Sequence, residues 1–237
     1  MATASLFGST GLVGSHILST LLSPASTSTV HTISRRAPKT TGPQLNSIIE
    51  PDTSVWSTTA LSGLTPAPNI VYSALGTTRA QAGGIANQWK IDHDLNVDIA
   101  RAAKASGNVK TFVFISSAGT RGMVFGKTPY AKMKNGVEDT IKELDFEHAI
   151  IVRPGLILGE REAPHGGFGA GIANTVVTGM GSLFGMGVQD KVGQEADTIA
   201  KAAIHAARLA EQGKAPSKYW VLEQNDIVRL GRTEWKD

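Results

Sequence analysis

Apolar positions along the chain follow two different spacings. Short apolar runs predict buried strands at 3–7, 30–34, 69–75, 110–119, 148–155 and 218–223. Apolar positions at helical spacing predict helices at 12–22, 91–106, 129–144 and 195–213. A weak further strand is expected near 53–57, after a loop at 38–44. Because strands alternate with helices, we expect an α/β fold with a doubly wound, Rossmann-like parallel sheet.

The length of 237 residues suits a single domain, so we expect one Rossmann-like domain over 1–237. The strand and helix pattern lapses between 159 and 194, where the sequence includes "GFGAGIANTVVTGMGSLFGMG". We interpret this insert as a small C-terminal substrate lid over the carboxyl edge of the sheet, where ligands bind in such folds. A dimer contact is an open alternative. A membrane contact fits less well, because residues 172–187 lack Lys and Arg.

Composition narrows the classes of function. The net charge is only +3 and no polybasic run is present, so we expect no nucleic-acid partner. The chain has no cysteine, which excludes disulfides, thiolate nucleophiles and cysteine-ligated zinc. No apolar stretch reaches the length of a membrane-spanning helix. Residues 1–49 lack acidic residues, as a transit peptide does, but cleavage there would delete the first strand and helix, so no cleavable presequence is expected.

The stretch "FGSTGLVG" joins the first predicted strand to the first predicted helix. In a dinucleotide-binding turn, Gly8 would permit the sharp exit from the strand and Gly11 the close approach of a pyrophosphate. Gly14 would allow the helix to pack closely on the sheet. The unpaired N–H groups of the helix N-terminus would then face the phosphates. A tight turn without a ligand would show the same three glycines, so the triplet leaves both readings open.

The end of the second strand bears on the choice of cofactor. About 20 residues past the glycine turn, NAD-binding folds carry an acid and NADP-binding folds an Arg. This chain has Ser34, Arg35 and Arg36 there, and the nearest acid is Glu50. The pattern favours NADP(H) over NAD(H), with an ordinary solvated loop as the alternative.

Tyr130 and Lys134 are four residues apart on a predicted helix and therefore share a face. A nearby ammonium stabilises a phenolate and lowers the pKa of a tyrosine from about 10. Tyr130 could then act as the acid for a carbonyl oxygen that receives a hydride. Ser117, which follows the preceding strand, could donate a hydrogen bond to the same oxygen. Such a pair arises by chance on many helices, and it gains weight here from the nucleotide turn.

These motifs carry a family resemblance. Gly8-x-x-Gly11-x-x-Gly14, Ser117 and Tyr130-x-x-x-Lys134 resemble the short-chain dehydrogenase/reductase superfamily, in its extended and atypical branches. More narrowly, the chain resembles the Tat-interactive-protein-2 oxidoreductases, and most closely their fungal relatives found in the mitochondrial proteome. The stretches that carry this likeness are "ISRR" (33–36), "ALGTTR" (74–79), "DHD" (92–94), "FISSAG" (114–119) and "VRPGLILGER" (152–161).

The resemblance implies roles for individual residues. Tyr130 would give or take the proton, and Lys134 would also hold the nicotinamide ribose. The phosphates would be lined by Ser9, Thr10, Gly11, Leu12 and Val13, and the 2′-phosphate by Arg35 and Arg36. Leu75 and Gly76 would flank the adenosine side, and Pro154 and Ile157 would lie near the nicotinamide. The fungal relatives imply a peripheral, cytosol-facing place on the mitochondrial outer membrane, and the superfamily often forms homodimers.

Two functions follow from this reading. The first is an NADPH-dependent oxidoreductase that acts on a small carbonyl or alcohol substrate. The second is an NADPH-binding regulator or scaffold at the mitochondrial outer membrane with little or no catalysis. We expect His93 to lie at a solvated helix start rather than to bind a metal. Asn96 is expected to be either a structural asparagine or an exposed helical residue.

Overall fold

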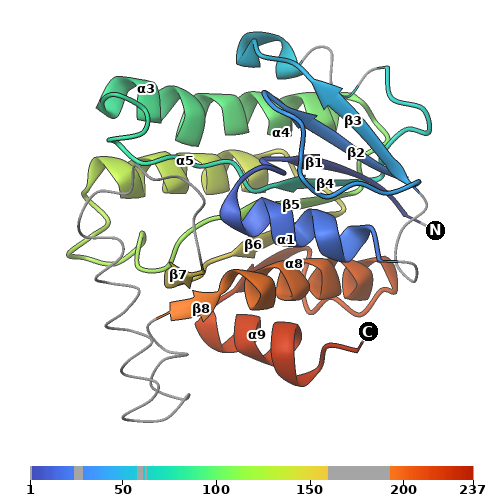
Figure 1. Ribbon diagram of the computed structural model, residues 1–237. Coiled ribbons are helices and arrows are strands. Elements are labelled where there is room, and N and C mark those ends of the chain that lie inside the picture. Colours follow the sequence, from blue (N-terminus) through green and yellow to red (C-terminus); the bar gives the residue numbers. More distant parts are fainter. Residues whose placement is uncertain (1, 24–28, 58–60, 62, 160–192, 237) are drawn as a thin grey trace.

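The computed structural model describes residues 2–23, 29–57, 61, 63–159 and 193–236. At its centre lies a seven-stranded parallel sheet with the order β3-β2-β1-β4-β5-β6-β9 (Figure 1). Its strands are β1 (Thr3–Phe7), β2 (Thr29–Ser34), β3 (Leu45–Ile49), β4 (Ile70–Ser73), β5 (Thr111–Ile115), β6 (His148–Val152) and β9 (Tyr219–Leu222). Chain order reverses between β1 and β4, and such a switch point opens a crevice at the carboxyl edge of a sheet.

Helices cover both faces of the sheet (Figure 1). One face carries α1 (Leu12–Leu21), α8 (Ala196–Glu211), α9 (Gln224–Val228) and the π-helical η3 (Arg229–Thr233). The other face carries α3 (Ile85–Trp89), the π-helical η2 (Lys90–Asp94), α4 (Leu95–Ala105) and α5 (Pro129–Glu143).

Each face has its own apolar core, because successive side chains of a strand point to opposite sides. Val113 of β5 packs with Ile17 and Ile199 under α1 and α8. Its neighbours Phe112 and Phe114 pack with Val137 on the opposite face. The expected α/β fold with a doubly wound parallel sheet is therefore confirmed.

The strand expected near 53–57 is wrong. Residues Thr53–Val55 form a short 3₁₀ helix, η1, in which the Ser54 N–H donates to the Asp52 carboxylate (2.9 Å). The edge strand is β3 (Leu45–Ile49) instead, in which Leu45 and Ile48 are half-buried and the other three residues are exposed. An edge strand with exposed positions lacks the continuous apolar run that marks the buried strands, which is why the pattern missed it.

Other boundaries shifted by a few residues. The helix expected from 91 begins at Ile85 and passes through η2 into α4. The strand expected over 148–155, with its break at Pro154, ends at Val152. After Pro154 the chain forms β7 (Leu156–Leu158), which pairs with β8 (Gly193–Glu195). Residues 160–192, which hold most of the expected lid, lie outside the described residues. None of the described helices is both long and apolar enough to span a membrane.

Candidate functional site at the carboxyl edge

The glycine turn lies between β1 and α1, as the sequence predicts. Gly8 has a φ of +86°, and a Cβ there would lie 2.7 Å from the carbonyl carbon of Ala74. A Cβ on Gly14 would lie 2.0 Å from the carbonyl oxygen of Gly8. Both glycines are therefore required by packing. Gly11 is exposed, and a Cβ there would meet only the Gly8 carbonyl oxygen, at 3.3 Å.

Two features of this turn fit an anion. The Ser9 hydroxyl is buried and has no hydrogen-bond partner among the described residues, and a buried unpaired hydroxyl calls for an explanation. The N-cap of α1 is Gly11, which has no side chain to accept from the first N–H groups of the helix. Free N–H groups at a helix N-terminus bind phosphates. Of the other predicted phosphate residues, Thr10 is exposed, Leu12 half-buried and Val13 buried.

The end of β2 lies beside this turn. Phe7 pairs with Ile33, so the register places Ser34 next to Gly8. The Ser34 hydroxyl donates to the carbonyl oxygen of Arg36 (2.7 Å), which bends the chain after the strand. The Arg35 and Arg36 side chains are exposed, and no carboxylate of the described residues forms an ion pair with either.

Glu50 lies beside Ser34 in the structure, although the two residues are well separated in the sequence. It follows β3, and its N–H donates to the carbonyl oxygen of Ser34 (2.9 Å). Its carboxylate accepts the N–H of Asp52 (2.8 Å) and so takes part in the turn that leads into η1.

The segment after β4 packs against the glycine turn. The Ala74 N–H donates to the carbonyl oxygen of Phe7 (3.0 Å), which brings Leu75 and Gly76 to the same edge. The next residue, Thr77, donates its N–H to the carboxylate of Asp92 (2.7 Å), and Gln88 donates to the other oxygen (3.1 Å).

Asp92 is fully buried in η2. Burial raises the pKa of this carboxyl, while the charge of Lys134 and the hydrogen bonds from Gln88 and Thr77 oppose the rise. A buried acid that holds the loop after β4 is a feature that the sequence analysis missed.

The predicted Tyr–Lys pair lies at the start of α5. Thr128 caps this helix by accepting the N–H of Ala131 (3.2 Å). The Lys134 side chain is only 4% exposed, and its ammonium donates to the carbonyl oxygen of Ile115 (3.0 Å) at the end of β5. It also lies 4.7 Å from the ring centroid of Phe114. Tyr130, one turn earlier, is 38% exposed.

Ser117 lies two residues past the carbonyl that Lys134 binds, and it is half-buried. In the described part of the chain, no hydrogen bond joins the side chains of Ser117, Tyr130 and Lys134. Catalytic hydrogen bonds are often long or absent before substrate binds, so the arrangement is compatible with a joint role. Lys134 and Ser117 thus lie at the carboxyl end of β5, and Tyr130 lies one helical turn before Lys134.

The loops after β5 and β6 are bonded to each other. The Ala118 N–H donates to the carbonyl oxygen of Pro154 (2.8 Å), so Ser117 and Pro154 lie in adjoining segments. Pro154 is buried and Ile157, in β7, is half-buried. A Cβ on Gly159 would lie 3.2 Å from Leu12, which shows that the chain returns to the glycine turn. The candidate residues are therefore distributed along one edge of the sheet.

The structure decides between the alternatives for Asn96 in α4 and corrects the expectation for His93 in η2. Asn96 is fully buried: it accepts the Ser73 hydroxyl (2.5 Å) and donates to the carbonyl oxygens of Ile91 (3.0 Å) and Asp92 (3.3 Å) across η2. The alternative of an exposed asparagine is therefore wrong, and Asn96 is structural.

His93 lies in a helix contact rather than at a solvated helix start. Its ring packs on Trp89, with 4.9 Å between centroids, and against Gly136 of α5. Its Nδ1 lies 2.8 Å from a carboxylate oxygen of Asp94. The described residues contain no cluster of His, Cys, Asp and Glu able to hold a metal ion.

A second buried acid, Glu138, also escaped the sequence analysis. It is fully buried in α5 and binds the Ser116 hydroxyl, Arg121 and Arg153. Burial alone would raise the pKa of Glu138, but hydrogen bonds from Arg153 and Ser116 and the charges of both arginines hold the pKa below its usual 4.5. Its spacing from Tyr130 and Lys134, eight and four residues along one helix face, was the available signal.

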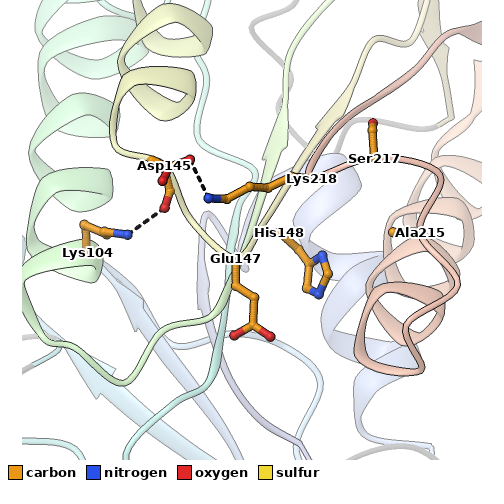
Figure 2. A pocket seen from close by; sticks show the side chains of 7 residues that line it. All are labelled: Lys104, Asp145, Glu147, His148, Ala215, Ser217 and Lys218. Carbon is orange, nitrogen blue, oxygen red and sulfur yellow. Dashed lines mark hydrogen bonds and ion pairs between the residues drawn. The ribbon is translucent and has the colours of Figure 1, made fainter.

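A cavity of about 590 Å³ lies at the opposite, amino edge, near the start of β6 (Figure 2). Two lysines of its lining bind Asp145: Lys104 donates to the Asp145 carbonyl oxygen (2.7 Å), and Lys218 pairs with the Asp145 carboxylate. Glu147 and His148 complete its polar lining. None of the predicted site residues borders this cavity.

The fold and the carboxyl edge together define a Rossmann-type protein with a dinucleotide-binding turn and a Tyr–Lys helix. A comparison with family profiles agrees: residues 4–219 match the NAD dependent epimerase/dehydratase family, and the chain belongs to that family.

Fungal proteins are among the relatives of the chain. It is 63% identical over 237 residues to "Protein FMP52, mitochondrial" of Chaetomium globosum, with 100% of both chains covered. It is 62% identical to "Protein fmp-52, mitochondrial" of Neurospora crassa, over 99% of this chain and 97% of that one. The expected likeness to fungal proteins of the mitochondrial proteome is thus confirmed.

Solved structures share the fold at low identity. The Bordetella bronchiseptica enzyme WbmH in complex with NAD+ superimposes with a TM-score of 0.65 at 16% identity, covering 94% of this chain and 75% of that one. MoeE5 in complex with UDP-glucose and NAD gives a TM-score of 0.65 at 15% identity, covering 98% and 81%.

Proposed function

We propose that the protein is an NADPH-dependent oxidoreductase that interconverts a small carbonyl compound and its alcohol. The observation that carries this proposal is the buried ammonium of Lys134, held at the carboxyl end of β5 one helical turn from Tyr130. Lysine is rarely buried unless its charge has a purpose or a partner. A protein that only binds a nucleotide has no need for a tyrosine activated for proton transfer.

The glycine turn would hold the cofactor pyrophosphate. The unpaired Ser9 hydroxyl and the N-terminus of α1 suit two phosphate groups. The solved structure of WbmH, which has the same fold, is a complex with NAD+. Arg35 and Arg36 favour a 2′-phosphate because they are exposed beside the turn and free of described ion pairs. We therefore propose NADP(H), with Leu75 and Gly76 on the adenosine side and Pro154 and Ile157 toward the nicotinamide.

The proposed chemistry needs one proton. When bound, NADPH supplies a hydride to the carbonyl carbon of the substrate. Tyr130 donates the proton of its hydroxyl to the carbonyl oxygen, which completes the alcohol. Lys134 favours the phenolate that remains, and Ser117 donates a hydrogen bond to the oxygen while charge develops there.

The cellular place of the protein belongs to the same proposal. Its close relatives are named mitochondrial, and we propose that this chain is mitochondrial as well. A peripheral, cytosol-facing position on the outer membrane, a homodimer and kinship with the Tat-interactive-protein-2 oxidoreductases remain predictions from sequence resemblance.

The test is NADPH oxidation by the purified protein against a panel of aldehydes, ketones and quinones, with Tyr130→Phe alongside. Tyr72→Phe is a matched control, because Tyr72 is buried in the core under α1 and α8. We expect Tyr130→Phe to abolish turnover while the NADPH dissociation constant stays within about threefold, and Tyr72→Phe to retain turnover. Equal turnover by Tyr130→Phe and the wild type would refute the role of Tyr130. NADPH binding without turnover on any substrate would favour the regulator instead.

A further inference from the structure

A buried carboxylate joins the three elements that carry the proposed catalytic and nicotinamide-binding residues. Glu138 lies in α5, eight residues after Tyr130 and four after Lys134, and its side chain is fully buried. None of the proposed steps uses it. An isolated buried carboxylate is costly, so its environment must compensate for the lost hydration.

The contacts of Glu138 account for both of its oxygens. Oε1 accepts the Ser116 hydroxyl (2.5 Å) and Nε of Arg153 (3.1 Å). Oε2 accepts Nη2 of Arg153 (2.6 Å), together with Nη2 (3.2 Å) and Nε (3.3 Å) of Arg121. Arg153 thus binds the carboxylate with two parallel hydrogen bonds, which fixes its orientation as well as its distance.

The partners of Glu138 are the immediate neighbours of site residues. Ser116 precedes Ser117, and Arg153 precedes Pro154. The two loops are also joined by the backbone bond from Ala118 to Pro154 (2.8 Å). Glu138 therefore connects α5, which carries Tyr130, to the carboxyl ends of both β5 and β6.

The network extends outward through both arginines. Arg153 also pairs with Glu223 (2.9 Å), the N-cap residue of α9, and Arg121 pairs with Asp139 (2.6 Å). Apolar side chains would stabilise such a contact between a helix and a sheet at least as well as buried charges do. The choice of a charged cluster therefore favours a role in fixing geometry over one in stability alone.

We infer that Glu138 is a positioning residue of the proposed active site, which sets Ser117 and Pro154 against Tyr130 through Ser116 and Arg153. This inference rests on the proposed function. The inference predicts different effects on the two halves of the cofactor. The glycine turn and Arg35, which would bind the adenosine half, lie on other strands and make no described contact with Glu138. The nicotinamide half depends on Glu138, whereas the adenosine half does not.

The experiment compares full-length wild type with Glu138→Gln, which keeps the shape of the side chain and removes its charge. Val137→Ala is the control for a general loss of packing, since Val137 is fully buried in the same helix but belongs to the apolar cluster under α4. Dissociation constants are measured for NADPH and for 2′,5′-ADP, which represents only the adenosine half. The melting temperature is recorded for each variant, and kcat and KM are measured on any substrate that the wild type turns over.

We expect Glu138→Gln to bind 2′,5′-ADP within about twofold of wild type and NADPH about tenfold more weakly. Its kcat should fall by about 10²-fold, the effect of a displacement near 1 Å in a catalytic group, with a smaller change in KM. Val137→Ala should leave all of these within about threefold. Unchanged NADPH binding and kcat in Glu138→Gln would overturn the inference. An equal loss of affinity for NADPH and for 2′,5′-ADP would also overturn it, if Val137→Ala shows the same loss at a similar melting temperature.

The two proposals fail in different ways. If the wild type does not bind NADPH, the proposed function fails, and the inference with it. If the wild type binds NADPH but turns over no substrate, the comparison of NADPH with 2′,5′-ADP decides the inference alone. If Glu138→Gln does not fold, Ser116→Ala replaces it, because it removes one contact and leaves both arginines paired. We then expect a loss of about fivefold in kcat or NADPH affinity, and wild-type values would overturn the inference.

Discussion

Substitution of the second and third turn glycines by alanine should separate folding from cofactor binding. In Gly14→Ala, the new Cβ would lie 2.0 Å from the carbonyl oxygen of Gly8 and 2.7 Å from its carbonyl carbon. Both atoms belong to the backbone, so no rotamer change relieves the overlap. Since Cβ–O contacts below 3.0 Å are essentially never seen, α1 and the turn must separate by about 1 Å.

The cost of this shift can be set against what alanine gains. Overpacking of a core costs about 1–3 kcal/mol of folding free energy. We expect Gly14→Ala to lie at the upper end of this range, because the overlapping atom is a backbone carbonyl oxygen. Alanine within a helix recovers about 1 kcal/mol relative to glycine. The net loss is therefore about 2 kcal/mol, which corresponds to a fall of about 4–8 °C in melting temperature for a chain of this size.

Gly11→Ala is the matched partner. Its Cβ would meet only the Gly8 carbonyl oxygen, at 3.3 Å, and the φ of −86° and ψ of 170° suit alanine. We expect the melting temperature to stay within about 3 °C of wild type, since the poorer N-cap and the reduced freedom of the unfolded chain each count for less than about 1 kcal/mol. The methyl group would instead stand where the pyrophosphate must approach, so NADPH affinity should fall by at least about tenfold, or about 1.4 kcal/mol.

Differential scanning fluorimetry and NADPH titration by fluorescence measure the two quantities on the same samples. A Gly14→Ala variant as stable as the wild type would refute the packing argument. A Gly11→Ala variant that binds NADPH like the wild type would refute the assignment of this turn to the pyrophosphate.

Three further outcomes are expected. Arg35→Ala should weaken NADPH binding roughly 10- to 150-fold and leave NADH binding nearly unchanged, because a charged hydrogen bond contributes about 1.5–3 kcal/mol; equal losses in titrations with both cofactors would contradict a 2′-phosphate role. Glu138 has a lowered pKa, so its stabilising contribution is present above pH 4.5 and is lost as pH falls through the pKa of the folded state. The difference in urea stability between wild type and Glu138→Gln should therefore shrink below that pH, and a constant difference would be evidence against the buried ion pair. Asn96→Ala should cost about 2–3 kcal/mol, or about 4–12 °C in melting temperature, because it leaves the Ser73 hydroxyl and the Ile91 carbonyl unpaired; a change under about 2 °C would be incompatible with these bonds.

The parts of the fold that sequence could predict are those with a strong local signal. The run "TFVFI" of β5 is buried on both faces of the sheet and can be predicted as a strand from its own residues. The edge strand β3, "LNSII", has exposed positions and depends on pairing with β2, which a local pattern does not contain. The expected strand at 53–57 contains the apolar residues Val55 and Trp56, but Thr53–Val55 forms a 3₁₀ turn capped by Asp52 instead.

The site divides in the same way. The glycine turn and the Tyr130–Lys134 pair could be predicted because each has its spacing within one short segment. Asp92 and Glu138 could not be assigned, because their partners Thr77, Ser116 and Arg153 come from other elements. Their burial and pairing become apparent only when the strands are assembled into one sheet.

The most direct test of the account follows the hydride itself. With a substrate found in the panel, the purified protein is given NADPH deuterated at the transferred position of the nicotinamide C4, and the alcohol product is examined by mass spectrometry. The account predicts one deuterium on the former carbonyl carbon, with incorporation lost in Tyr130→Phe. Oxidation of NADPH that leaves the product without deuterium would contradict hydride transfer at this site.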